Sequence, residues 1–166
     1  MEITIRKGYK GDVPAVFSLV KELAVYEKAP DEVTVTVEDM ERDGFGDNPL
    51  FKFIVAETQG RIVGMALYYI KYSSWKGKCV FLDDIVVTEK MRRFGIGKKM
   101  FEAVITETQY LKAGRLEWQV LDWNTPAIKF YEKYKSQVLK EWVTCRLTKD
   151  QMAVMEFPHV NREVSQ

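Results

Sequence analysis

One stretch of the sequence, residues 81–111, limits what this chain can fold into more than any other. It begins with an apolar run that contains only two charges, Asp83 and Asp84. It continues through a basic, glycine-containing loop at residues 92–99 and ends in a long apolar-periodic run. This pattern predicts a buried strand, a turn and a helix that begins at the loop. Because a helix N-terminus has unpaired backbone N–H groups and a partial positive charge, the loop is predicted to bind phosphate.

Two well-known phosphate loops do not fit these residues. A Walker loop requires glycine where Arg92 stands and a hydroxyl residue where Lys99 stands. The dinucleotide fingerprint requires a small residue where Met100 stands. Glycines at positions 95 and 97 would still let a bulky anion approach the backbone, because they have no Cβ. A glycine-bearing turn with solvated cations is the plainer alternative.

The composition is that of a soluble globular protein that buries a core. The chain has 166 residues, 46% apolar and 30% charged, and a net charge of +1. The near-neutral balance argues against nucleic acid as a partner, and no apolar run reaches the roughly 20 residues of a membrane span. No signal-peptide core is present at the N-terminus, so we expect the cytoplasm.

The cysteine and histidine content argues against a metal site. Cys79 and Cys145 are far apart, both lie within strand-like sequence, and both are predicted to be buried free thiols. His159 is the only histidine and lies in a polar stretch near the end of the sequence. A metal centre with several histidines is therefore excluded, and we predict no metal.

The hydrophobic pattern predicts one α/β (α+β) domain over residues 1–156 with a polar tail at 157–166. We expect the order β-α-α-β-β-β-α-β-α-β, a mixed and mostly antiparallel sheet with helices on both faces. Asp12 is predicted to cap the first helix, Thr36 the second and Asn124 the last. Gln59-Gly60 marks a tight hairpin, and a long final strand is expected over residues 137–147.

Arg92-x-x-Gly95-x-Gly97 after an apolar strand resembles the pyrophosphate loop of the GNAT N-acetyltransferases. The element order is also that of this family, and residues 124–131 resemble its second signature. Further local matches resemble the diamine acetyltransferases, the spermidine/spermine and thialysine enzymes. These matches lie at residues 21–27, 43–46, 68–69 and 94–97.

The resemblance implies a GNAT fold, acetyl-CoA as co-substrate and a homodimer. It also implies a set of cofactor-binding residues in the strand, the loop and the last helix: Ile85, Val86, Val87, Arg92, Arg93, Phe94, Gly95, Ile96, Gly97, Lys98, Asn124, Ala127 and Tyr131. Tyr131 is the implied proton donor to the departing sulfur, and plain core packing is the alternative for this aromatic residue.

The resemblance assigns the acceptor side to a second set of residues. Asp83 is given a catalytic, substrate-facing role, and because neighbours on a strand alternate, Asp84 is expected on the opposite face. The substrate-binding candidates are Tyr26, Glu27, Asp83, Glu117, Trp118 and Gln119. A structural polar bulge at Asp83 and a solvated loop at Glu27 are the alternatives.

The leading hypothesis is therefore an enzyme that moves an acetyl group from acetyl-CoA to a primary amine of a small polyamine or diamine by direct attack in a ternary complex. Lysine-like amino acids and protein amines are alternative acceptors, and a non-catalytic acyl-CoA-binding module is an alternative of another class. The sequence departs from the family at Lys135, where a glycine that ends the last helix is common.

Overall fold

The computed structural model describes residues 2–156. Its contacts fall into two units, Met1–Leu121 and Asp122–Gln166, and each is described by itself. The single domain over residues 1–156 stays a prediction, and the predicted tail at 157–166 lies outside the described residues.

The first unit is built around a five-stranded sheet in the order β1-β2-β3-β4-β5. The strands are β1 (Thr4–Lys7), β2 (Lys52–Thr58), β3 (Arg61–Ser73), β4 (Gly77–Val87) and β5 (Leu116–Trp118). The first four pair antiparallel, and β5 pairs parallel to β4 after a helical crossover. The mixed, mostly antiparallel sheet predicted from the sequence is confirmed.

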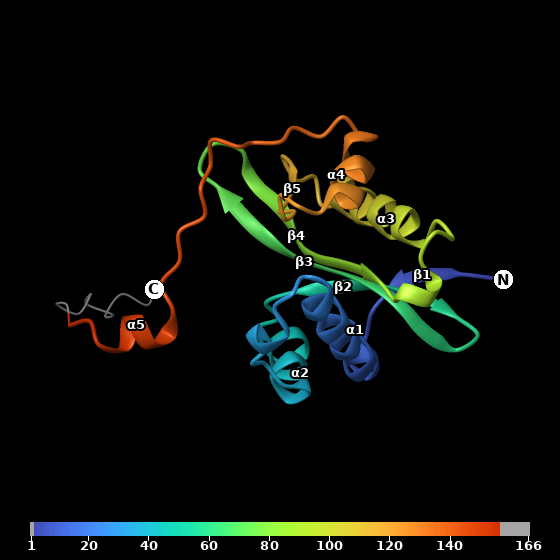
Figure 1. Cartoon of the computed structure of the whole chain (residues 1–166), viewed down its shortest axis with the longest axis horizontal. Coiled ribbons are helices and arrows are strands. Elements are labelled where there is room, and N and C mark those ends of the chain that lie inside the picture. Colours follow the sequence, from blue (N-terminus) through green and yellow to red (C-terminus); the bar gives the residue numbers. More distant parts are fainter. Residues whose placement is uncertain (1, 157–166) are drawn as a thin grey trace. The chain divides into compact units, whose positions relative to one another are not determined.

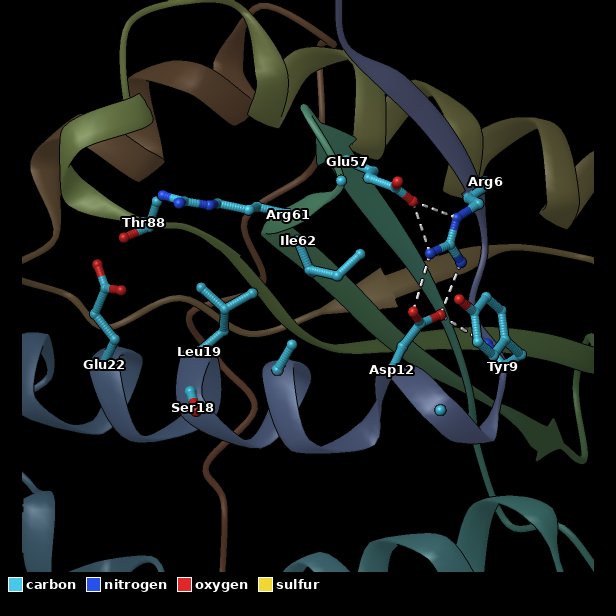
Figure 2. Close-up of a pocket in the computed structure, with 13 residues that line it drawn as sticks. Arg6, Tyr9, Asp12, Ser18, Leu19, Glu22, Glu57, Arg61, Ile62 and Thr88 are labelled. Atoms are coloured by element: carbon cyan, nitrogen blue, oxygen red, sulfur yellow. Dashed lines mark hydrogen bonds and ion pairs between the residues drawn. The ribbon is translucent and has the colours of Figure 1, made fainter.

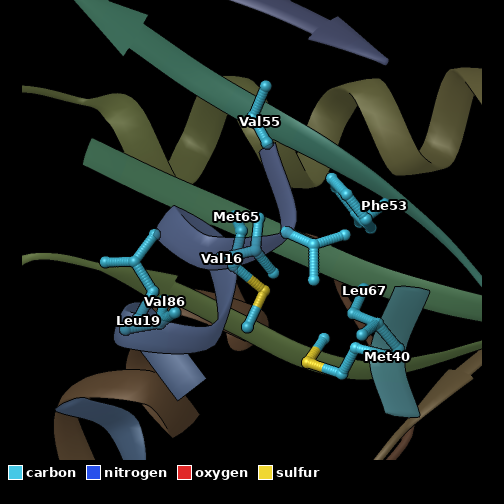
Figure 3. Packing of buried hydrophobic residues seen from close by; sticks show 9 residues of the cluster. Val16, Leu19, Met40, Phe53, Val55, Met65, Leu67 and Val86 are labelled. Carbon is cyan, nitrogen blue, oxygen red and sulfur yellow. The ribbon is translucent and has the colours of Figure 1, made fainter. Parts of the chain in front are cut away.

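Helices cover both faces of this sheet (Figure 1). On one face lie α1 (Val13–Tyr26) and α2 (Val37–Phe45), and on the other lies α3 (Ile96–Tyr110). Residues of α1 and α2 pack on apolar side chains of β2, β3 and β4, including Val55, Met65, Leu67 and Val86 (Figure 3). These side chains therefore identify the face of the sheet that α1 covers.

Turn and cap residues explain several of the boundaries. The β2–β3 turn has φ values of 49° at Gln59 and 70° at Gly60, the pair of positive angles that a tight two-residue hairpin requires. The Thr36 hydroxyl accepts the Asp39 N–H at 3.1 Å, which begins α2. Asp12 occupies the predicted N-cap position of α1, but its carboxylate is held by Arg6 and makes no cap bond, so the predicted capping interaction is wrong.

The second unit contains α4 (Thr125–Glu132) and the short α5 (Lys149–Ala153). The strand predicted over residues 137–147 is absent from the described chain, and the residues of that segment are largely exposed. A strand forms only where a neighbour completes its hydrogen-bond ladder, and within the described chain this segment pairs with no strand. Its apolar composition alone therefore misled the sequence prediction.

Candidate active site

The glycine loop after β4 leads directly into α3, as predicted. Gly95 precedes the helix with a φ of 75°, a left-handed conformation that glycine adopts without strain. Apart from its chain neighbours, no atom lies within 4 Å of a Cβ built on Gly95, and apart from the chain neighbours and the backbone of the helix itself only the Val87 Cγ2, at 3.8 Å, does so for Gly97. The backbone at the helix start is thus open to a close approach, and its unpaired N–H groups suit a phosphate.

Arg92 is fixed by contacts at the end of α1. Its Nε donates to the Val87 carbonyl at 3.0 Å, and its guanidinium lies 5.0 Å from the centre of the Tyr26 ring. Its Nη2 is 3.8 Å from a carboxylate oxygen of Glu22, which also accepts the Glu89 N–H at 2.8 Å. Tyr26 was predicted to contact the acceptor; the structure places its ring against the arginine of the phosphate loop. Arg93, at φ 71°, and Phe94 are exposed on the same loop.

β4 and β5 pair over only three residues. Their register joins Val80, Phe81 and Leu82 to β5, whereas β4 continues to Val87. From Asp83 onward, this edge of β4 has no partner strand in the described part of the chain. The outward-facing peptide groups of residues 85–87 have no strand partner at this edge and are available to an extended, amide-bearing ligand, except the Val87 carbonyl, which already accepts from Arg92.

A β-bulge places Asp83 and Asp84 on the same face of the sheet. In the β3–β4 register, Tyr68 pairs with Leu82 and Leu67 with Asp84, so Asp83 has no partner. Asp84 pairs with Leu67, a residue of the face covered by α1. Asp83 follows Phe81 by two positions, and Phe81 pairs with Tyr69, which shares the face of Leu67. The expectation that the two acids face opposite sides is therefore wrong.

Glu27, just after α1, completes a cluster with these two acids, which we call the acidic cluster (Glu27, Asp83 and Asp84). Within the described residues, none of its carboxylates has a hydrogen bond or ion pair. Burial raises the pKa of each of the three. Burial and then the charges of Asp83 and Glu27 raise the pKa of Asp84 to about 7. Asp83 is the most exposed of the three.

An aromatic pair and two cations extend the same face beyond the acidic cluster. The Tyr69 and Phe81 rings are 5.3 Å apart, and burial and then the charge of Asp83 raise the pKa of Tyr69. Glu117 pairs with Lys71 at 3.1 Å and lies 3.5 Å from Arg115. Glu117 was predicted to bind substrate; it lies on this face, but two cations already share its charge.

The other two candidates, Trp118 in β5 and Gln119 after it, are placed differently from Glu117. The Trp118 ring packs edge-on against Phe101 of α3, with the ring centres 5.2 Å apart, which places it on the opposite face. Gln119 follows directly after β5. Their roles in substrate binding stay predictions.

In the second unit, the motif residues occupy the expected places on α4. The Asn124 side chain accepts the Ala127 N–H at 3.4 Å, so the predicted cap is confirmed. Tyr131 is buried, its ring centre is 5.2 Å from that of Phe130, and burial raises its pKa to about 12. Lys135 adopts a φ of 55° just after the helix, so a lysine takes the left-handed conformation that glycine would take without strain.

A cavity of about 640 Å³ runs along α1 from Asp12 to Glu22, beside the β2–β3 turn (Figure 2). None of the predicted site residues lines it. The Arg6 guanidinium holds Asp12 through bonds of 2.7 and 2.9 Å and Glu57 through one of 2.9 Å. This bonding lowers the pKa of Asp12. Because the acids here are already paired with a cation, we assign the cavity no part in catalysis.

The described residues contain no group of three or more His, Cys, Asp or Glu side chains arranged to hold a metal ion. No helix of the described chain is long and apolar enough to cross a membrane. The absence of a metal and the cytoplasmic location both stay predictions.

With this geometry established, comparison with known proteins decides the family. The model of the acetyltransferase (GNAT) family matches residues 15–135. The chain belongs to the GNAT family. It is therefore an acetyl-CoA-dependent N-acetyltransferase, and the resemblance read from its motifs is confirmed.

Two relatives and one solved structure show how close this GNAT protein is to others. It is 37% identical over 147 residues to thialysine N-epsilon-acetyltransferase of Bos taurus, across 84% of this chain and 86% of that protein. It is 37% identical over 134 residues to the Homo sapiens spermidine/spermine N(1)-acetyltransferase-like protein 1, across 76% of this chain and 19% of that protein. The structure of aminoglycoside N-acetyltransferase AAC(6')-Iy in complex with CoA matches with a TM-score of 0.70 at 19% identity, across 88% of this chain and 95% of that one. The last likeness shows the fold.

Sequence reasoning missed Asp84 and Glu22 as members of the site. Asp84 was expected on the far face, and only the bulge brings it beside Asp83. Two adjacent acids within an apolar strand are a visible sign of such a bulge, because strict alternation would place one of them in the apolar core. Glu22 carried no comparable signal.

Proposed function

We propose that this GNAT enzyme acetylates a primary amine of a small molecule that carries a second positive charge, with a polyamine or diamine as the leading acceptor. The observation that supports this proposal is the acidic cluster, which has no cation of its own among the described residues. Such a cluster attracts a polycation and repels a substrate carboxylate. It lies where the free edge of β4 begins, so an amine bound there would be near a thioester held along that edge.

The residues of the first unit fit acetyl-CoA. The peptide groups that residues 85–87 present at the unpaired edge of β4 suit its amide-bearing arm, and the open backbone at Gly95 and Gly97 suits its pyrophosphate. We assign Asn124, Ala127 and Tyr131 to the same co-substrate through the family's second signature. When bound, acetyl-CoA supplies the activated acetyl group that the amine attacks.

Tyr131 is proposed to stabilise the departing sulfur by donating a hydrogen bond. With its pKa raised to about 12, full proton transfer to a thiolate whose thiol has a pKa near ~8.5 is uphill by about 5 kcal/mol. A hydrogen bond that strengthens as charge develops on sulfur is therefore the favoured role. Tyr131→Phe should lower kcat by about 10²-fold, and an unchanged kcat across the pH range would remove Tyr131 from the mechanism.

A lysine-like amino acid is the second candidate acceptor, and a different observation favours it. Lys71 and Arg115 are two cations that share one acid, Glu117, on the same face as the acidic cluster. Their excess positive charge could take the carboxylate of an amino acid while the acidic cluster takes its side-chain ammonium.

Thiol release from acetyl-CoA, measured with a panel of amines, tests the proposal. The panel contains putrescine, spermidine, lysine, ornithine, thialysine and a lysine-containing peptide. The acidic cluster predicts the highest kcat/KM for spermidine or putrescine. Higher values for the amino acids would favour the second candidate, and Lys71→Ala should then weaken their binding specifically. No amine-dependent release with any of these would overturn the proposed acceptor class.

We also propose a homodimer. Residues 137–147 carry apolar side chains that are more than half exposed, namely Val138, Leu139, Trp142, Val143 and Leu147. The far edge of β5 has no partner strand in the described chain. An exposed apolar segment of this kind is typical of an interaction site. Light scattering should give twice the mass of one chain, and Val143→Glu should reduce that mass to the monomer value.

A further inference from the structure

The acidic cluster raises the question of which carboxylate removes the proton from the acceptor. An alkyl ammonium has a pKa near ~10.4, so at neutral pH its nitrogen must lose a proton before it can attack. Acids beside the ammonium also stabilise its charge, so three identical acids would oppose the reaction. The three carboxylates of this cluster are not identical.

Exposure separates Asp83 from the other two acids, because Glu27 and Asp84 are both only partly exposed, and position then separates Asp84, within the strand, from Glu27, after α1. Asp83 stands at the bulge, unpaired in the register and exposed to solvent. Asp84 pairs with the buried Leu67, lies two residues from the buried Val86 and is only partly exposed. The groups that face Asp84 are Asp83 on its own strand and Glu27 after α1, with the aromatic Tyr69 on β3 beside Asp83. Lys71, further along β3, is already paired with Glu117.

In this arrangement the negatively charged carboxylates of Asp83 and Glu27 lie near Asp84, whose carboxylate is less exposed to water than that of Asp83. Both neighbours make it harder for Asp84 to ionise, and no cation offsets them in the described residues. A base is most effective when its pKa lies near the working pH, because it is then both ionised and able to hold a proton. Asp84 meets this condition better than the exposed Asp83.

We propose that Asp84, and not its neighbour Asp83, takes the proton from the acceptor ammonium before the amine attacks. This inference rests on the proposed function. Asp83 and Glu27 hold the acceptor's positive charges, and their negative charges raise the proton affinity of Asp84.

The step balances in atoms and electrons. One N–H bond of the ammonium breaks and one O–H bond forms on Asp84, which leaves an electron pair on nitrogen. That pair forms the C–N bond to the acetyl carbon, and the C–S bond breaks with its electrons going to sulfur. The second proton lost by nitrogen ends on sulfur, and Asp84 returns the first to solvent. The products are the amide, the free thiol and one proton.

The first measurement does not depend on turnover. Carboxyl carbons of the labelled protein are titrated by NMR in the wild type and in Asp84→Asn. We expect one signal that titrates near pH 7 in the wild type and is missing in Asp84→Asn. If that signal is instead missing in Asp83→Asn, or if no carboxyl titrates above about pH 6, the assignment to Asp84 is overturned.

The second measurement is kcat against pH at saturating acceptor and acetyl-CoA. The kcat of the wild type should rise with increasing pH and reach a plateau near pH 7, and this rise is the limb that the variants test. Asp84→Asn should lose that limb, fall by about 10²–10⁴-fold at pH 7.5 and then gain about tenfold per pH unit as free amine appears. Asp83→Asn and Glu27→Gln should keep the limb but shift it to lower pH, because each removes a negative charge beside Asp84.

These outcomes distinguish a failure of the role proposed for Asp84 from a failure of the proposed function. If Asp84→Asn keeps the wild-type limb while the wild type is active, Asp84 is not the base and the proposed function stands. If the wild type itself releases no thiol with any amine of the panel, the proposed function fails, and the role of Asp84 fails with it. A structural role alone would not remove the limb in Asp84→Asn while moving it to lower pH in both Asp83→Asn and Glu27→Gln.

Discussion

The two ends of α1 carry acids in opposite circumstances. Before the helix, Asp12 is buried, bonded to Arg6 and part of a cluster with Glu57, and its pKa is lowered. After the helix, Glu27 lies with Asp83 and Asp84, where no cation is bonded to any of them in the described residues and the pKa of each is raised. Paired acids stabilise a fold, whereas unpaired acids destabilise it and are retained where they bind or react. The comparison predicts that substitutions at the two ends have opposite effects.

The largest expected effect is at the paired end. Asp12→Asn should lower the free energy of unfolding by about 3 kcal/mol at pH 7, because it leaves the Arg6 guanidinium without its principal partner. The pKa of Asp12 is lowered on folding, so its stabilising effect is present above its unfolded pKa near ~4 and is lost as the pH falls below it. Urea unfolding at pH 7 and pH 2 measures this difference, which should shrink at pH 2. Asp31→Asn, at an exposed site, is the control and should change stability little.

At the unpaired end, Glu27→Gln should act on binding. We expect the KM of the cationic acceptor to rise about tenfold, equivalent to about 1.4 kcal/mol, while the KM of acetyl-CoA and the urea midpoint stay close to wild type. Steady-state kinetics with each substrate varied in turn measure both constants. A large loss of stability with an unchanged acceptor KM would make Glu27 a structural residue like Asp12 and would erase the contrast.

The smallest expected effect tests directly whether ionisation of Asp84 stabilises or destabilises the folded protein. The pKa of Asp84 is raised to about 7 on folding, so folding favours its protonated form and stability falls as the pH rises from about 4 to about 7. Asp84→Asn should therefore be more stable than wild type by about 1 kcal/mol at pH 8, a value reduced for partial solvent exposure. At pH 4 the two should be equal. Urea unfolding at both pH values checks this, and a variant that is less stable at pH 8 would contradict it.

Local signals explain how much of the fold and site could be predicted from the sequence. The Arg92 to Lys98 loop, the Gln59-Gly60 turn and the Thr36 and Asn124 caps depend on residues close together in the chain, and all lie where expected. The errors depend on contacts between distant residues. Asp12 resembles a helix cap until Arg6 is placed beside it, and residues 137–147 resemble a strand until a neighbouring strand is required.

The acidic cluster lies between these cases. Asp83 was singled out from the sequence, but its partnership with Asp84 depends on a bulge that appears only in the register with β3. Lys135 shows a related limit. The sequence marks it as unusual, and the structure shows that the backbone keeps the left-handed turn despite the side chain.

The free edge of β4 has a consequence for handling and assembly. Unpaired peptide groups along a strand can form hydrogen bonds with another extended chain. Proteins commonly protect such edges with charged side chains or by covering them. Here Asp83 and Asp84 stand at the start of the exposed edge, where like charges would discourage two copies from joining edge to edge. Acetyl-CoA bound in the proposed site would cover the remainder, so saturating acetyl-CoA should stabilise the folded protein as well as supply the acetyl group.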